Sequence, residues 1–158
     1  MVNESLMSYE IERKFLVDKD KLPTVYDREY IIKQAYIISD NRGVVRIRQQ
    51  DDKYILTIKL KDVGIRQIEI ERDLTEDEFD ILWNKADKKL FKTRKVIGHW
   101  EIDFFHNLSD KYADLILAEI ELTSVDEYVT IPTWVNTEVT GNSDFFNNNL
   151  IKWSIQYG

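Results

Sequence analysis

Charged residues of one sign recur in pairs along this sequence, with a single residue between the two members of each pair. Carboxylate oxygens are the ligands that hard divalent cations prefer. Arginine grips phosphate oxygens in a two-pronged fork, and lysine presents a point charge to them. The pairs, together with one mixed triplet at the start, are Glu10, Glu12 and Lys14; Arg46 and Arg48; Lys59 and Lys61; Glu69 and Glu71; Lys92 and Arg94; Glu101 and Asp103; and Glu119 and Glu121.

The spacing of two is that of a β-strand, in which residues i and i+2 share a face. Apolar residues fill most of the positions between the charged ones, with Arg13 and Thr93 as exceptions, so the charged pairs belong to alternating segments. The Asp51-Asp52 pair between two such segments indicates a tight hairpin turn. Eight strands are expected, over residues 9–17, 35–39, 44–50, 53–61, 65–73, 90–97, 99–105 and 115–122.

Two arrangements of the charged faces are compatible with this alternation. An ordinary antiparallel sheet turns its polar face to solvent. A closed sheet can instead enclose the charged side chains, and its apolar face must then be covered from outside. Same-sign neighbours repel each other unless they bind something, which favours the second arrangement. Periodicity alone does not distinguish the two.

Two segments are predicted to be helical and to cover an apolar sheet face. Thr75 and Glu78 have the spacing of a capping box, and Phe79, Leu82 and Trp83 follow at helical spacing. A second amphipathic segment is expected over residues 143–154, although its Asn147-Asn148-Asn149 run has poor helix propensity.

Composition limits the class of protein. The 158 residues, 43% of them hydrophobic, suit a single domain over 1–158 with a real core, and residues 1–8 are expected to be a flexible N-terminus. There are no cysteines, which excludes thiolate chemistry and favours the cytoplasm. The net charge of −7 argues against nucleic acid as a partner, and no apolar run is long enough to span a membrane.

Seven segments, in order, are similar to the motifs of the CYTH, or triphosphate tunnel metalloenzyme, family. Glu10-Ile11-Glu12-Arg13-Lys14 resembles the ExExK signature of that family. The resemblance runs from about Tyr9 to Leu150. It continues through Val45-Arg46-Ile47-Arg48, Leu56-Thr57-Ile58-Lys59, Ile68-Glu69-Ile70-Glu71, Lys92-Thr93-Arg94, Trp100-Glu101-Ile102-Asp103 and Ala118-Glu119-Ile120-Glu121.

The resemblance implies a mainly antiparallel α+β fold: a closed eight-stranded β-barrel, or triphosphate tunnel, with amphipathic helices packed outside. It implies an inorganic triphosphatase-like activity, in which Mg²⁺ or Mn²⁺, as two ions, supports attack of water on tripolyphosphate. Metal ligands are then expected at Glu10, Glu12, Glu119 and Glu121. Glu69, Glu71 and Asp103 are expected either to complete the metal shell or orient water, or to be charge partners for the bases inside the tunnel. Triphosphate ligands are expected at Lys14, Arg46, Arg48, Lys59, Lys61 and Arg94, and the catalytic set comprises Glu10, Glu12, Lys14, Arg48 and Glu121.

Two further functions use the same residues. One is an enzyme acting on an organic triphosphate: a class IV-type adenylate cyclase, a nucleoside triphosphatase or a thiamine triphosphatase. The other is a non-catalytic module that binds polyphosphate. In every case the expected partner is a small phosphorylated molecule, and the sequence leaves open whether the chain is a monomer or a homodimer.

Overall fold

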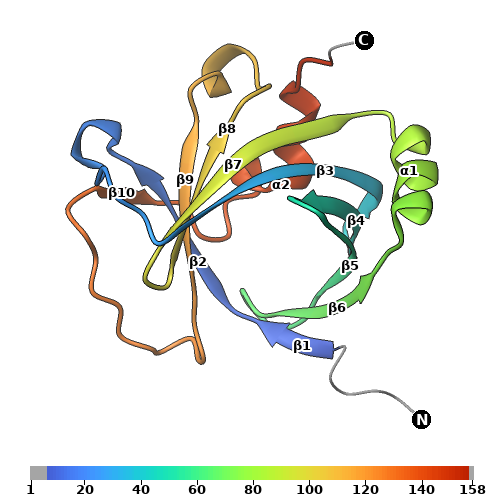
Figure 1. Ribbon diagram of the computed structural model, residues 1–158. Helices are drawn as coiled ribbons and strands as arrows, with labels where there is room; N and C mark the ends of the chain where they lie inside the picture. The colour runs from blue at the N-terminus through green and yellow to red at the C-terminus, as the bar shows by residue number, and fades with distance from the viewer. Residues whose placement is uncertain (1–6, 157–158) are drawn as a thin grey trace.

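The computed structural model describes residues 7–156, which form one strongly curved antiparallel sheet with short helices on its outer side (Figure 1). The strands lie in the order β1-β6-β5-β4-β3-β7-β8-β9-β2-β10. Their bounds are β1 Met7–Glu10, β2 Glu12–Val17, β3 Arg28–Asp40, β4 Gly43–Gln50, β5 Lys53–Lys61, β6 Gln67–Asp73, β7 Lys89–Ile97, β8 Trp100–Phe105, β9 Ile116–Glu121 and β10 Val135–Glu138.

The predicted closed eight-stranded barrel is wrong in its closure: within residues 7–156 the sheet has ten strands and is not closed into a barrel. The reason lies in the first segment, which is interrupted at Ile11. Before the interruption β1 pairs with β6, and after it β2 pairs with β9. One continuous segment therefore supplies β1, at one edge of the sheet, and β2, next to β10 at the other edge. The two strands are joined by the peptide chain and not by a ladder of hydrogen bonds.

The other strands follow the alternating segments. All eight predicted segments contain strand, although β3 is far longer than the expected 35–39, and β10 was not predicted. Register aligns the charged pairs across the sheet: Arg46 lies opposite Thr57, Lys59 opposite Glu69, and Arg94 opposite Asp103. The paired side chains consequently gather on one face.

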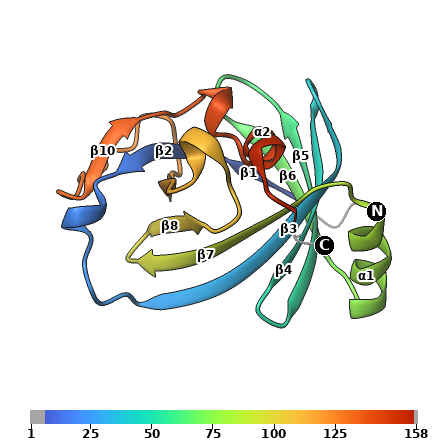
Figure 2. The same ribbon diagram turned by 90° about the horizontal axis from the view of Figure 1, so that it is seen from above.

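The charged faces turn to the concave side of the sheet, and the apolar faces turn outward. One outer cluster forms around Phe15, Trp100 and Trp134, and another around Leu90, Phe105 and Leu150. Under helix α1, Glu76–Lys85, a third cluster places Phe79 against Ala35 and Ile47. Figure 2 shows α1 lying outside the sheet, beside β4.

The capping box predicted for α1 is confirmed. The Thr75 hydroxyl accepts a hydrogen bond from the Glu78 backbone at 3.1 Å, and the Glu78 carboxylate accepts one from the Thr75 backbone at 2.9 Å. These contacts satisfy two of the backbone donors that a helix N-terminus leaves unpaired.

The single helix expected over 143–154 is wrong. That segment consists of a 3-10 turn Ser143–Phe145, one helical turn α2, Asn147–Leu150, and a second 3-10 turn Ile151–Trp153. Asparagine favours local side-chain bonds over helix continuation. Two other 3-10 turns are Lys19–Lys21 and Asp110–Tyr112.

The expected flexible N-terminus, residues 1–8, lies largely outside the described residues, although Met7 and Ser8 already belong to β1. Among residues 7–156, no helix has the length and apolar character that crossing a bilayer requires.

Two alanine substitutions on α1 test whether its buried face holds it to the sheet. Phe79 is 2% exposed and Ile81 is 64% exposed. We expect Phe79→Ala to lower the free energy of unfolding by about 3–5 kcal/mol, because it leaves a cavity between helix and sheet. The matched variant Ile81→Ala should change it by about 0.5 kcal/mol or less. Urea denaturation measures both, and equal losses would contradict the assigned packing.

Candidate functional site

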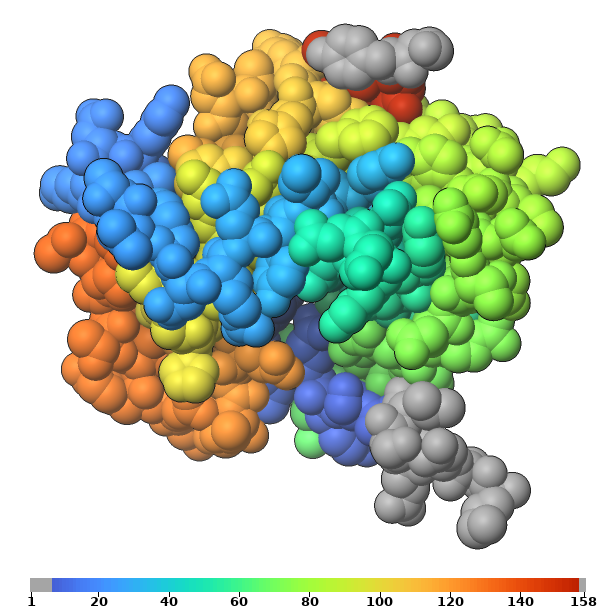
Figure 3. All heavy atoms as spheres, in the orientation of Figure 1, coloured from blue at the N-terminus to red at the C-terminus, as the bar shows by residue number. Residues whose placement is uncertain are grey.

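The concave side of the sheet contains a cavity of about 860 Å³. Figure 3 shows the surface hollowed at its centre, between the strands coloured blue and those coloured green. Nine Lys or Arg and eight Asp or Glu residues line the cavity, a near balance in a chain whose net charge is −7. The site therefore concentrates positive charge relative to the rest of the molecule.

The cavity wall brings together twelve of the thirteen residues that the sequence predicted for the site. They are Glu10, Glu12, Lys14, Arg46, Arg48, Lys59, Lys61, Glu69, Glu71, Arg94, Glu119 and Glu121. The thirteenth, Asp103, is not a lining residue; it is 1% exposed and lies behind the wall.

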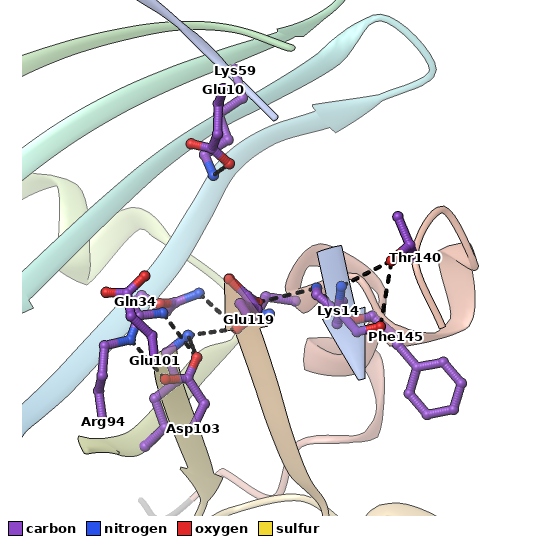
Figure 4. A network of polar contacts seen from close by, with 12 residues as sticks. Glu10, Lys14, Gln34, Lys59, Arg94, Glu101, Asp103, Glu119, Thr140 and Phe145 are labelled. Carbon is purple, nitrogen blue, oxygen red and sulfur yellow. Dashed lines mark hydrogen bonds and ion pairs between the residues drawn. The ribbon is translucent and has the colours of Figure 1, made fainter. Parts of the chain in front are cut away.

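Carboxylates dominate one side of the cavity, on β1, β2 and β9. Glu12 lies directly opposite Glu121, and Lys14 lies opposite Glu119 with Nζ 3.4 Å from a carboxylate oxygen. Lys59, on β5, has its Nζ 2.9 Å from a carboxylate oxygen of Glu10, on β1. Figure 4 shows the Lys59–Glu10 pair set apart from the group around Glu119.

Crowding of these carboxylates shifts their pKa values in different directions. Burial, followed by the charge of Glu119, raises the pKa of Glu12 well above its usual range. Burial also raises the pKa of Glu121, with Glu10 adding to the effect. Burial opposes ionisation of Glu119 as well, but Lys14 outweighs it and the pKa falls to about 2. Among residues 7–156, Glu119 has a cationic neighbour, Lys14, at ion-pair distance, whereas Glu12 and Glu121 have none. An added cation would supply the missing positive charge.

Asp103 is a counter-charge for the bases of β7. Its carboxylate accepts hydrogen bonds from Arg94 Nε at 2.7 Å and from Lys92 Nζ at 2.7 Å. Although burial alone would raise the pKa of Asp103, these two cations lower it far below its usual range. Glu101 accepts a further bond from Arg94 at 2.9 Å. Both carboxylate oxygens of Asp103 are occupied, so the structure supports the charge-partner role for this residue.

Arg46 and Arg48 differ from Lys14, Lys59, Lys92 and Arg94, each of which lies at ion-pair distance from a carboxylate. Within residues 7–156, neither has a carboxylate at ion-pair distance; Arg46 Nη2 donates to the Thr57 hydroxyl at 3.2 Å, and Arg48 donates to the side-chain oxygen of Gln34. Arg46 is 8% exposed, and its Nε is a buried donor without a hydrogen-bond partner. Burial, followed by repulsion from Arg46 and Arg94, lowers the pKa of Arg48. Two arginines placed in this way have donors available for an anion.

The carboxylates fit a hard divalent cation, although in residues 7–156 no three Asp, Glu or His side chains already form a cage. Mg²⁺ keeps several waters and needs only one or two protein carboxylates when substrate phosphates supply further oxygens. Glu12 and Glu121, facing each other on neighbouring strands, meet that requirement.

Sequence reasoning missed several residues of the site. Lys92 and Glu101 were recognised as members of charged pairs but were not assigned to the site, and both line the cavity. Thr140 and Asn147 come from the C-terminal segment and also line it. Asn147 belongs to the Asn run, and Thr140 to the segment 138–141, which resembles the closing motif of the short bacterial members of the family. Neither feature indicates contact with strands more than a hundred residues earlier.

Comparison with known proteins gives consistent results. A family model described as the CYTH domain matches residues 8–139. An inorganic triphosphatase of Acetivibrio thermocellus is 32% identical over 152 residues, covering 92% of this chain and 95% of the relative. The crystal structure of the inorganic triphosphatase NE1496 aligns with a TM-score of 0.63 at 28% identity, covering 94% of this chain and 100% of that one.

A more distant structure shares the fold alone. A putative adenylate cyclase from Bacillus halodurans aligns with a TM-score of 0.59 at 19% identity, covering 75% of this chain and 83% of the other.

Removing the negative charge of Asp103 tests its role as counter-charge. We expect Asp103→Asn to destabilise the protein by about 3–5 kcal/mol, because it leaves buried Lys92 and Arg94 without their shared partner. The exposed pair Asp40–Arg42 supplies the control, since Asp40→Asn should leave stability unchanged within error. Chemical denaturation of both variants checks the difference; a fully stable Asp103→Asn would contradict this role.

Proposed function

The chain belongs to the CYTH domain family, and from that premise we propose that it hydrolyses inorganic tripolyphosphate to pyrophosphate and phosphate with the help of divalent metal ions. Two relatives that span nearly its whole length are named inorganic triphosphatases. The substrate is then a small, highly charged anion that is held entirely inside the cavity.

One observation carries the proposal: among residues 7–156, buried Arg46 and half-buried Arg48 have no carboxylate at ion-pair distance, and they face a cavity whose opposite side holds Glu12 and Glu121 without an ion pair. An anion alone would satisfy Arg46 and Arg48 but would repel the glutamates. A cation alone would do the reverse. A polyphosphate bound together with metal ions satisfies both sides, because each member neutralises one side of the cavity.

The bases of β4, β5 and β7 are assigned to binding the phosphates. Arg46 and Arg48 lie side by side on β4, and Arg94 reaches the cavity from β7 while Asp103 and Glu101 hold it. Lys59, Lys61 and Lys14 complete the ring of positive charge. Because a phosphoryl group in transfer carries spread negative charge, donors fixed in advance stabilise it more than donors that must reorganise.

The carboxylates of β1, β2 and β9 are assigned to holding two ions, Mg²⁺ or Mn²⁺. Glu10, Glu12, Glu119 and Glu121 would be the ligands, with Glu69 and Glu71 next to them. Bound there, the ions would supply charge neutralisation on the phosphates and acidification of the attacking water. Glu121, exposed at the end of β9, would hold a water beside the terminal phosphate.

The compartment follows from composition. A chain with no cysteine and a net charge of −7 suits a reducing cytoplasm and a free small-molecule substrate rather than nucleic acid or membrane.

The first test is a substrate and metal panel. We expect phosphate release from tripolyphosphate with Mg²⁺ or Mn²⁺ and its loss when EDTA is added, because the carboxylate side then lacks its cations. Phosphate assay and ion chromatography measure release and products. Slow tripolyphosphate turnover beside rapid turnover of ATP, or appearance of cyclic AMP, would transfer the assignment to an organic triphosphate.

The second test removes one carboxylate. We expect Glu121→Gln to fold normally and to reduce kcat by about 100-fold, since loss of a metal-site carboxylate costs at least this order. Glu29→Gln, an exposed glutamate on β3, is the charge-matched control and should keep the kcat of the native chain. Undiminished turnover by Glu121→Gln would remove this residue from the site.

A further inference from the structure

Two neutral amides connect two bases of the cavity to each other. The side-chain oxygen of Gln34 accepts hydrogen bonds from Arg48 Nε at 3.2 Å and from Arg48 Nη2 at 3.0 Å. The amide nitrogen of Gln34 donates to Asn147 Oδ1 at 3.3 Å. The same Asn147 oxygen accepts a hydrogen bond from Lys92 Nζ at 2.9 Å. Arg48, Gln34, Asn147 and Lys92 thus form one continuous chain of contacts.

The two amides come from distant parts of the sequence, and each is fixed in place. Gln34 lies on β3 directly opposite Arg48, is 0% exposed, and also donates to the Tyr36 hydroxyl at 3.0 Å. Asn147 begins α2, and its neighbours anchor that turn. The Phe145 carbonyl accepts a bond from Lys14 Nζ at 3.0 Å, and Asn148 donates to the Ser39 hydroxyl at 2.9 Å.

An amide oxygen orients a bound guanidinium as a carboxylate does, but it does not neutralise the positive charge. Arg94 is held by Asp103 and Glu101, which fix its direction but cancel its charge. Gln34 grips Arg48 in a similar two-bond geometry while leaving the guanidinium charge uncompensated. An oriented cation that keeps its charge binds an incoming phosphate without first giving up an ion pair.

We propose that Gln34 and Asn147 are positioning residues that act as one bridge: they tie Arg48 to the buried Lys92 and aim Arg48 at the phosphates, while within residues 7–156 no carboxylate lies at ion-pair distance from Arg48. The proposal rests on the proposed function for the identity of the anion. It assigns to the C-terminal segment, through Asn147, a direct part in substrate affinity.

Substitution of Gln34 separates orientation from charge. Gln34→Met has similar volume and removes the acceptor; Gln34→Glu keeps an acceptor for Arg48 but adds a negative charge. We expect both to raise the KM for tripolyphosphate about 10-fold, the order of one charge-assisted hydrogen bond, with kcat changed much less. Gln49→Glu makes the same charge change on the outer side of β4, where Gln49 bonds only the Asp51 carbonyl, and should leave KM unchanged.

A double-variant cycle tests whether the two amides act as one unit. Asn147→Leu should also raise KM, and the double variant Gln34→Met with Asn147→Leu should be little worse than the more affected single variant, because residues in one network are not additive. If the increase in KM of the double variant equalled the product of the two single increases, the residues would act separately and the bridge would be overturned. Asn147 is half-buried, so its variant decides the question if the fully buried Gln34 does not tolerate methionine.

Calorimetric titration with tripolyphosphate and Mg²⁺, in the Glu121→Gln background that suppresses hydrolysis, distinguishes this proposal from the proposed function. Weaker binding by the Gln34 and Asn147 variants, if the native chain hydrolyses nothing, would leave the positioning role standing and remove the enzymatic one. Affinity and KM within two-fold of the native chain in folded Gln34→Glu and Asn147→Leu would overturn the positioning role, whatever the native chain hydrolyses.

Discussion

Like charges brought together out of water are the constraint on which this structure depends. Nine bases and eight acids line one cavity, and each must be paired, left accessible to an ion, or neutralised by a proton. Asp103 forms ion pairs with Lys92 and Arg94, and Glu10 forms one with Lys59. Arg46 and Arg48 on one side, and Glu12 and Glu121 on the other, remain uncompensated by protein groups of opposite sign.

The fold reverses the usual arrangement of a sheet protein to hold these charges. Apolar residues that would ordinarily fill the space enclosed by a curved sheet form three clusters on its outer side, covered by α1, by the C-terminal turns and by the segment around Trp134. The outer packing provides the stability, and the inner face is free to carry groups that destabilise one another until ligands bind. In the proposed function, binding of a metal–polyphosphate pair therefore also relieves the repulsion among the charged groups of the inner face.

Much of this could be predicted from the sequence, because strand periodicity is strict. Spacing of two placed Arg46 with Arg48, and Glu119 with Glu121, on common faces, and twelve of thirteen predicted residues lie on the cavity wall. Periodicity does not report which charges pair across strands, so the sequence leaves Asp103 open between the metal shell and a charge partner, and the structure pairs it with Lys92 and Arg94. Periodicity also does not report long-range contacts, so it does not predict the contact between Gln34 and Asn147. Closure was expected from the family resemblance, and neither the motifs nor the alternation contains information on where hydrogen bonding stops.

The interruption at Ile11 allows one short segment to pair with two different strands. Glu10 and Glu12 stand on either side of it, and each is held by a different neighbouring strand: β6 for the first, β9 for the second. A slip of β1 by a single residue would turn Tyr9 into the cavity and Glu10 out to solvent, while Glu12 and Lys14 stayed in place. Whether Glu10 contributes its carboxylate to the cavity is thus set by the length of peptide between β1 and β2, which belong to opposite sides of the opening in one sheet.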